Sequence, residues 1–417
     1  MILQSNYSHP AFRQVPRTGV IYVMTEATRL GYSASNKQWC NFGQGAPETG
    51  PLKNSPERVR SVSFKDEEHE YAPVDGLPEL REAVAELYNQ RYRNNHSSKY
   101  TKDNVAISSG GRLGLTRVVS TLGRTNVGHF LPDYTAYEEL LDAFGTFVPI
   151  PILLDDQSDY AFGPEDLRKE ILGRGLSAVL RSNPCNPTGK LLQGEELEGW
   201  VSVCRELNTA LIIDEFYSNF IYSSKDLSVS AAEFIDDVDK DPVLIVDGLT
   251  KNWRYPGWRV SWTVGPKDLI EAVASAGSFL DGGCARPMQQ AALKLVNVDI
   301  ADKEARSIKE TFSKKKEYLC AELKELGIRI TPDPEGSFYC WGDLRGLPEE
   351  LQNGMDFFQK ALEHKVIIVP GTFFDINPGQ RRPDRPSRFK HFARFSFGPT
   401  IEELQVGVSS LKKLIKG

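Results

Sequence analysis

The sequence predicts an α/β protein whose large domain holds a mostly parallel sheet, with a smaller α+β domain after it. The chain has 417 residues, which is too long for one ordinary compact domain. Short apolar runs alternate with amphipathic stretches through its middle, as expected of βαβ units whose sheet is covered on both faces. After about residue 290 the pattern changes to a long polar helix followed by short strands.

Seven apolar runs are the candidate strands of the large sheet. They are Val105–Ile107, Gly128–Leu131, Phe147–Ile152, Ala178–Arg181, Ala210–Ile213, Val243–Val246 and Arg259–Val264. Later in the chain we expect a helix over Asp302–Leu326 and strands at Phe338–Trp341, Val366–Val369 and Arg394–Phe397. The predicted domains are an N-terminal arm with part of the small domain over residues 1–55, a large domain over 56–295, and a small domain over 296–417.

Composition narrows the class of protein. Hydrophobic residues make up 40% of the chain and the formal net charge is -6, with no dense basic block, so we expect no nucleic-acid partner. The six cysteines form no C-x-x-C pair, which predicts no metal site and is typical of a reducing compartment. The first residues contain no apolar signal core and no later run could span a bilayer, so we expect a cytoplasmic protein without a membrane partner.

Two polar residues follow buried runs at positions where chemistry is expected. Asp214 ends the run ALIID, and Tyr217 lies three residues later. A carboxylate there is unfavourable unless it meets a cation, although it could also cap the next helix. Lys251 follows another buried run, with Arg259 beyond it. A partly desolvated lysine near another cation has a lowered pKa and becomes a nucleophile. Ligands of parallel sheets gather at the carboxyl ends of the strands, where both residues are expected.

Two further loops follow predicted strands. The first is a candidate phosphate site, and the second contains an uncommon motif. Gly110 and Gly111 follow the first strand and precede a helix, so backbone N–H groups and the helix dipole would favour an anion. Glycine pairs are also common in ordinary turns. The string NPCNPTGK, residues 183–190, has two Asn-Pro pairs followed by Thr-Gly.

Together these motifs resemble the signature of the class I/II aminotransferases, a family of fold-type I enzymes that depend on pyridoxal 5'-phosphate (PLP). The resemblance covers most of the chain, because further motifs occur in the family's order. These are YAPVDGLPELREAV, PDYTAY, VIIVPGTFF and HFARFSFG. The family implies an enzyme with PLP as its cofactor, a small-molecule amino acid as its substrate, and a homodimer with shared active sites.

The resemblance implies a role for each matching residue. Three matching residues are catalytic. Lys251 is implied to carry the cofactor as a Schiff base and to move the substrate proton. Asp214 is implied to pair with the ring nitrogen of the cofactor, and Tyr217, together with Asn186, to donate to its ring oxygen. Further residues are implied to bind the cofactor. Tyr134 would stack on its ring, and Tyr71 would reach its phosphate from the neighbouring subunit. The other phosphate-binding residues would be Gly110, Gly111, Arg112 and Arg259. For the substrate the matching residues are Arg394, which binds the α-carboxylate as a bidentate fork, Asn186, and Gly45, which lines the site.

The sequence departs from the family pattern at two positions. Gly248 stands where many relatives have a serine that donates to the phosphate, and Thr250, which is adjacent to Lys251, could replace it. In aspartate aminotransferases, an arginine six residues before a proline binds the distal carboxylate of aspartate. When that proline is matched to Pro287, Asp281 stands at the position of the arginine. A carboxylate there favours a basic side chain and disfavours acidic substrates, unless the alignment is shifted and Asp281 is an ordinary loop residue.

Three functions follow from these motifs. The first is an aminotransferase that acts on an arginine- or lysine-like amino acid and a 2-oxo acid. The second is a PLP-dependent cyclodehydratase that eliminates water from a hydroxyarginine-like substrate and closes a ring. The third, which the early start of the motifs near Gly43 disfavours, is a regulator with an aminotransferase-like sensor domain and no enzymatic activity.

Overall fold

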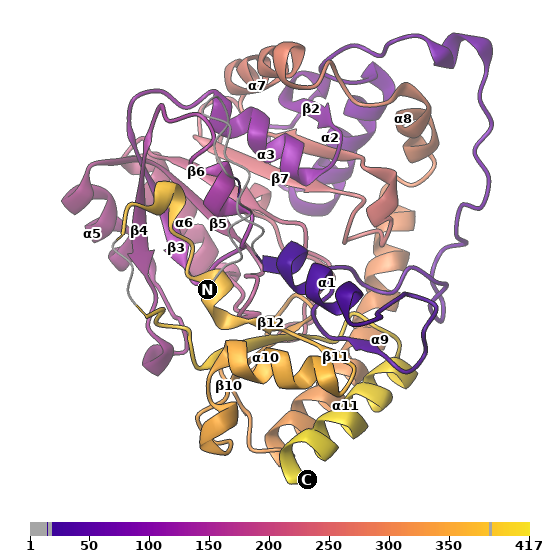
Figure 1. The fold of residues 1–417 in the computed structure, drawn as a ribbon. Helices are drawn as coiled ribbons and strands as arrows, with labels where there is room; N and C mark the ends of the chain where they lie inside the picture. The colour runs from indigo at the N-terminus through magenta and orange to yellow at the C-terminus, as the bar shows by residue number, and fades with distance from the viewer. Residues whose placement is uncertain (1–14, 16–18, 383–385) are drawn as a thin grey trace, which may run out of the picture.

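The computed structural model describes residue 15, residues 19–382 and residues 386–417. Figure 1 shows a seven-stranded sheet in the upper part of the molecule and a smaller sheet, with the C-terminal helices, in the lower part. The N-terminal helix α1 (Gly19–Arg29) lies between these parts. The described residues include no helix that is both long and apolar enough to cross a membrane.

The large sheet has the strand order β2-β8-β7-β6-β5-β3-β4. Its members are β2 (Val105–Ser108), β3 (Asn126–Leu131), β4 (Val148–Leu153), β5 (Leu176–Ser182), β6 (Ala210–Asp214), β7 (Val243–Gly248) and β8 (Ser261–Val264). Only β8 runs against its neighbours, so the sheet is mostly parallel. Each of the seven predicted runs became one of these strands, and the predicted fold class is confirmed.

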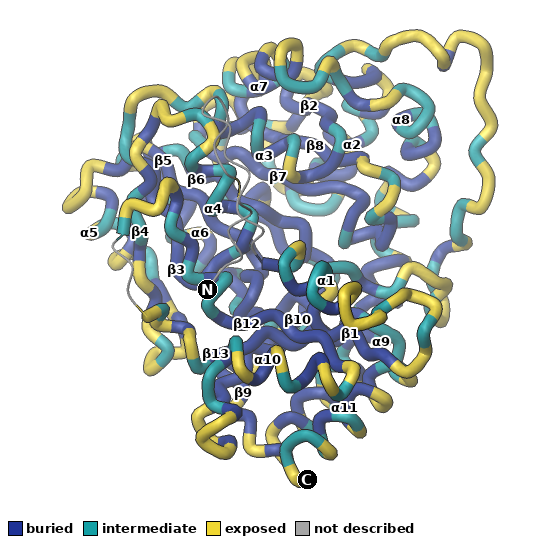
Figure 2. Tube along the Cα trace, in the orientation of Figure 1, coloured by how far each residue is buried: buried dark blue, intermediate teal, exposed yellow. Residues whose placement is uncertain are grey.

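Helices pack against this sheet and against one another. They are α2 (Pro78–Tyr92), α3 (Gly111–Ser120), α4 (Tyr137–Leu140), α5 (Pro164–Arg174), α6 (Gly194–Glu206), α7 (Lys267–Leu280) and α8 (Arg286–Leu293). The central strands are buried along almost their whole length, as Figure 2 shows, which explains why they read as continuous apolar runs. An exposed segment joins β1 (Cys40–Asn41) to α2 and runs away from the body of the molecule.

The smaller sheet has the order β12-β13-β10-β9 and is antiparallel. Its strands are β9 (Arg329–Ile330), β10 (Tyr339–Asp343), β12 (Val369–Pro370) and β13 (Phe392–Ser396), while β11 (Val366–Ile367) pairs with β1. The accompanying helices are α9 (Val298–Glu325), α10 (Gly354–Glu363) and α11 (Ile401–Lys416). The β1–β11 pair ties residues 40–41 to the C-terminal part of the chain. The domain limits at 55 and 295 remain a prediction.

Parallel strands bring their carboxyl ends to one edge of the sheet. The segments after β2, β3, β5, β6 and β7 therefore converge there. Because β8 is antiparallel, the segment before it also reaches this edge, and that segment contains Arg259. The topology thus places residues from six strands around one space.

Candidate active site

A cavity of about 390 Å³ lies at this edge, between the large sheet and the C-terminal part. The large sheet's loops, the N-terminal segment and the smaller sheet all contribute to its walls. The lining residues include Gly45, Gly111, Arg112, Tyr134, Asn186, Asp214, Tyr217, Thr250, Lys251, Arg259, Tyr339 and Arg394. Most of the predicted site residues are thus gathered around one space.

Lys251 and Asp214 face this cavity from neighbouring strand ends. The Lys251 amine donates to the carbonyl oxygen of Gly45. The pKa of Lys251 is lowered to about 7, first by burial and then by the positive charges of Arg394, Arg112 and Arg259, whereas Asp214 opposes this shift. A lysine with this pKa is largely neutral at slightly alkaline pH and can act as a nucleophile.

The Asp214 carboxylate is held by two donors. The Tyr137 hydroxyl donates to Oδ2 at 2.9 Å, and the Phe216 backbone N–H donates to Oδ1 at 3.3 Å. Burial raises the pKa of Asp214 to about 6, while the bond from Tyr137 opposes the rise. Tyr137, the second tyrosine of PDYTAY, was missed as a site residue, because a fully buried tyrosine is more often part of the core.

A cradle for an anion lies at the start of α3. Gly110 has a φ of 90°, and a Cβ there would lie 2.0 Å from Nη2 of Arg259, so only glycine lets the guanidinium approach. The Thr250 hydroxyl is buried in the cavity wall and has no hydrogen-bond partner among the described residues. Backbone N–H groups at a helix N-terminus, a guanidinium and an unpaired hydroxyl form a donor set that fits a phosphate group.

The backbone around position 248 explains why this chain has a glycine there. A Cβ at this position would lie 2.5 Å from the Cα of Ser261 and 2.7 Å from the carbonyl oxygen of Val260. Both are backbone atoms of the adjacent antiparallel segment, so the usual serine would collide with them. The unpaired hydroxyl of Thr250, two residues later, is the nearby donor.

Arg394 reaches the cavity from β13. Its Nη1 donates to Oδ1 of Asn186 and its Nη2 to the carbonyl oxygen of Gly43, both at 2.8 Å, while Nε has no hydrogen-bond partner among the described residues. The guanidinium is 1% exposed, and none of these partners carries a negative charge. A buried cation in this state is suited to an incoming carboxylate.

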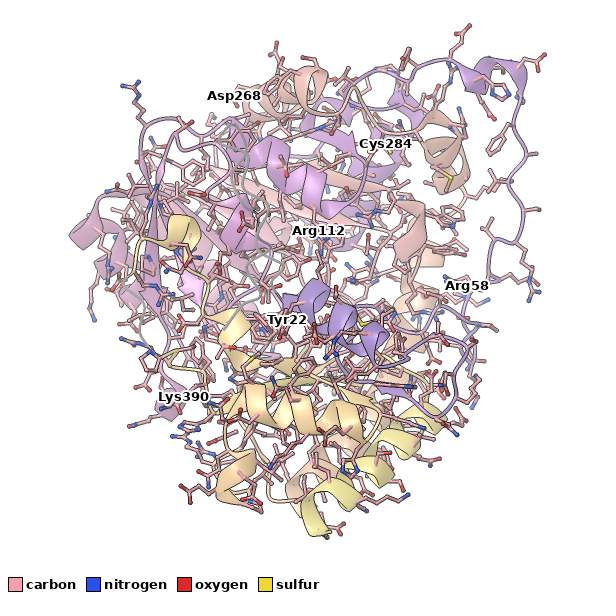
Figure 3. All side chains as sticks on the ribbon, in the orientation of Figure 1. Tyr22, Arg58, Arg112, Asp268, Cys284 and Lys390 are labelled. Atoms are coloured by element: carbon pink, nitrogen blue, oxygen red, sulfur yellow. The ribbon has the colours of Figure 1, made fainter. Side chains whose placement is uncertain are left out.

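Arg112 lies at the cavity beside Tyr134. Its Nε and Nη2 donate to the Tyr134 hydroxyl at 3.2 and 3.1 Å. Figure 3 shows Arg112 in the centre of the molecule, between α3 and α1. The side chain is exposed and forms no ion pair with a carboxylate among the described residues.

Three predicted residues are not part of this cavity wall: Gly110, which directly precedes Gly111 of the wall, Tyr71 and Asp281. Tyr71 is 94% exposed on the segment between β1 and α2, so its reach into a neighbouring subunit remains a prediction. Asp281 follows α7 and is bound by Arg117 through two bonds, Nη2–Oδ1 at 2.5 Å and Nε–Oδ2 at 3.0 Å. Because Arg117 already neutralises the Asp281 carboxylate, this geometry does not support the predicted role of Asp281 in binding a basic substrate side chain.

The residues around the cavity fit PLP in chemical type. They offer a buried carboxylate for a protonated ring nitrogen, a lysine of lowered pKa for an aldehyde, an aromatic ring at Tyr134, and the phosphate cradle at Gly110. The described residues contain no group of three or more His, Cys, Asp or Glu side chains that could hold a metal ion.

Comparison with known proteins gives the same family. The family model for aminotransferases of class I and II matches residues 37–411. A probable aspartate/prephenate aminotransferase of Aquifex aeolicus is 26% identical over 381 residues, covering 90% of each chain. The aspartate/prephenate aminotransferase of Thermus thermophilus is 28% identical over 332 residues, covering 78% of this chain and 82% of that one.

Solved structures show the same fold. A Thermus thermophilus aspartate aminotransferase with maleate superposes with a TM-score of 0.77 at 22% identity, covering 97% of this chain and 100% of that one. An aminotransferase from Mycobacterium tuberculosis gives a TM-score of 0.79 at 22% identity, covering 99% and 100%. With the family model spanning most of its length, the chain belongs to the class I and II aminotransferases and is a PLP-dependent enzyme.

Proposed function

We propose that this aminotransferase takes the amino group from an L-amino acid with an anionic side chain and passes it to a 2-oxo acid. The observation that carries the choice of substrate is Arg112, a cavity arginine without a carboxylate partner among the described residues. Several of the relatives are named aspartate aminotransferases, which supports an acidic substrate.

The chemistry rests on Lys251 and Asp214. Bound PLP supplies an electron-withdrawing ring that accepts the electron pair left when a proton leaves the substrate Cα. The Lys251 amine, with its pKa near 7, would take that proton from the substrate Cα and hold it as the base of the site. The Asp214 carboxylate holds a proton on the ring nitrogen, and Tyr137 keeps this carboxylate oriented.

Arg394 recognises the part of the substrate that all amino acids share. Its guanidinium binds the α-carboxylate, with Asn186 and Gly43 fixing its orientation. A fixed α-carboxylate restricts rotation about the bonds of Cα, which selects the bond to be broken. Arg259, Thr250 and the Gly110–Gly111 turn hold the phosphate.

Arg112, which the family motif placed at the phosphate, is proposed instead to bind the distal group of the substrate. Arg259 lies against Gly110 and Arg394 lies among Asn186, Gly43 and Tyr339, so each has a separate anion to bind. The Arg112 guanidinium instead lies at the Tyr134 hydroxyl. A carboxylate at the end of the substrate side chain would find two donors there, an N–H and an O–H.

The active form is proposed to be a homodimer. Tyr71 lies on the exposed segment between β1 and α2, which runs away from the body of the molecule (Figure 1). An exposed tyrosine on such a segment is available to a second copy, where it would add a hydroxyl to the phosphate site.

The test compares amino donors. The PLP-loaded enzyme is mixed with aspartate, glutamate, alanine, arginine or lysine, and amino transfer is followed by mass spectrometry and by the visible spectrum. We expect the two acidic donors to give the highest kcat/KM. Arg112→Gln should lower kcat/KM for acidic donors about tenfold to a hundredfold and leave alanine nearly unchanged. Arg124→Gln, at an exposed arginine outside the cavity, is the matched control.

Two alternatives are outcomes of the same experiment. Preferred turnover of arginine or lysine, abolished in Asp281→Asn, would favour the aminotransferase for basic amino acids and contradict the role of Arg112. Loss of water from hydroxyarginine without amine transfer would favour the cyclodehydratase. The bidentate contact of Asp281 with Arg117 argues against both, because it removes the carboxylate on which a basic side chain depends.

A further inference from the structure

Tyr339 lies in the cavity at the start of β10, and neither the family motifs nor the proposed function assigns it a role. It is fully buried and lines the same wall as Arg394, which lies on the adjacent strand β13. Its ring and its hydroxyl contact two different site residues. The inference below rests on the proposed roles of those two residues.

The ring of Tyr339 supports the Arg394 guanidinium. The Cζ atom of Arg394 lies 4.1 Å from the centroid of this ring, and the ring of Phe374 is next, at 5.3 Å. Asn186 and Gly43 hold the Nη atoms. Because Arg394 is buried without a carboxylate, the negative face of an aromatic ring compensates part of the lost hydration. The contact therefore keeps a charged guanidinium in place before a ligand arrives.

The hydroxyl of Tyr339 contacts the other site residue. It lies 2.9 Å from the hydroxyl of Tyr217, and either atom could be the donor. If Tyr339 donates, the Tyr217 proton remains available to an acceptor in the cavity, which is the role proposed for it. Both rings are buried and pack edge to face with centroids 5.5 Å apart, so the two hydroxyls have little freedom to separate.

We propose that Tyr339 is a positioning residue that links the carboxylate-binding arginine to the hydroxyl of Tyr217. Its ring holds Arg394 ready for the α-carboxylate, and its hydroxyl orients the proton of Tyr217 toward the cofactor. The two functions reside in different atoms, so different substitutions separate them.

The test uses two substitutions in the cofactor-loaded enzyme. Tyr339→Phe keeps the ring and removes the hydroxyl, whereas Tyr339→Leu removes both. Two readouts do not depend on turnover: the dissociation constant of the non-reacting dicarboxylate maleate, and the pH midpoint of the visible absorbance band. Tyr222→Phe is the matched control, because the hydroxyl of this half-buried tyrosine donates to the Ser337 carbonyl oxygen at 2.6 Å and lies outside the cavity wall.

We expect Tyr339→Phe to bind maleate as the wild type does, within about twofold, and to shift the pH midpoint. Tyr339→Leu should also weaken maleate about fivefold to thirtyfold, as expected for a desolvated cation–π contact. In the Tyr217→Phe background, Tyr339→Phe should cause no additional shift. The control should change neither quantity.

Three results would overturn the proposal: no shift of the midpoint in Tyr339→Phe, an equal shift in the absence of the Tyr217 hydroxyl, or weakened maleate binding in Tyr339→Phe. Unchanged maleate binding in Tyr339→Leu would overturn the role of the ring. If Tyr339→Leu does not fold, the three comparisons in Tyr339→Phe still decide the role of the hydroxyl. Failure of the proposed function would appear separately, as an absence of amino transfer from acidic donors by the wild type.

Discussion

The buried cations around the cavity differ from those in the surrounding framework. In the framework, Arg117 is paired with Asp281, Arg254 with Glu304 at 2.6 Å, and Lys315 with Glu48 at 2.6 Å. In the cavity, Arg394 contacts only neutral acceptors, and Lys251 donates to a backbone carbonyl. The chain thus supplies a carboxylate to each of these three framework cations, although the buried Arg93 is held by backbone carbonyl oxygens instead, and it leaves Arg394 and Lys251 for ligands.

Framework cations and cavity cations should therefore respond differently when they are substituted. In a buried pair that is complete within the chain, removing one member strands the charge of the other and destabilises the fold. A buried cation without an anion is unfavourable for the isolated chain and is fully compensated only when a ligand binds. Substitution of a framework cation should therefore affect stability, and substitution of a cavity cation should affect ligand binding and turnover.

The largest expected effect is that of Lys251→Ala. Loss of the amine removes both the attachment of the cofactor and the proton carrier, so the rate of amino transfer should fall by at least about 10⁴-fold. The visible band of the loaded enzyme should disappear while the thermal midpoint of the cofactor-free protein changes little. Lys315→Met is the framework counterpart and should keep the band but lower the midpoint. A Lys251→Ala enzyme that still turns over at a measurable fraction of the wild-type rate would contradict the assignment.

The next effect contrasts two arginines. Arg117→Gln strands the Asp281 carboxylate in a buried position and should lower stability by about 3–5 kcal/mol. Arg394→Gln should change stability far less but raise the KM of amino acids and the dissociation constant of maleate about a hundredfold. Urea unfolding of the cofactor-free proteins and ligand titration of the loaded ones measure the two quantities. Equal destabilisation by both substitutions would remove the distinction between framework and cavity.

The sequence predicted the strands and the main site residues because both leave local signals. Buried parallel strands are continuous apolar runs, and Asp214, Asn186 and Lys251 directly follow such runs. Tyr137 and Tyr339 left no such signal, since a buried tyrosine in an apolar stretch resembles any core residue. Their functions become visible only from hydrogen bonds to residues 77 and 122 positions away.

Asp281 shows why the substrate was the weakest part of the prediction. Its partner Arg117 lies 164 positions away along the chain, so no local pattern could reveal that the carboxylate is already bound. Gly248 is a similar case, because the reason for a glycine is the backbone of Ser261 on a neighbouring strand. Tertiary contacts, from α3 to the end of α7 for Asp281 and between neighbouring strands for Gly248, decide both positions.

A smaller effect concerns the pH dependence of cofactor uptake. Burial, and then the charges of Arg394, Arg112 and Arg259, lower the pKa of Lys251 in the cofactor-free protein to about 7. The rate of PLP uptake should therefore rise with pH through about 7, as the neutral amine becomes populated. Between this value and the unperturbed lysine pKa of about 10.4 the unfolded chain binds more protons, so the contribution of Lys251 to stability rises with pH. Arg394→Gln should move the midpoint of uptake upward, and an unchanged midpoint would contradict the electrostatic cause.

The smallest predicted effect tests the one carboxylate that lines the cavity among the described residues. Tyr137→Phe removes a donor to Asp214 and should raise the pKa of this carboxyl above about 6. A raised pKa leaves Asp214 protonated at low pH, where it can no longer hold a proton on the ring nitrogen. The rate of amino transfer should fall about twofold to tenfold at pH 6 and recover toward the wild-type rate at pH 8, because the carboxyl is ionised there in both proteins. Tyr100→Phe, at a buried hydroxyl that has no hydrogen-bond partner among the described residues and lies outside the cavity wall, should show no such dependence. If the Tyr137→Phe loss were equal at both pH values, the tyrosine would act on the geometry of the site and not through the ionisation of Asp214.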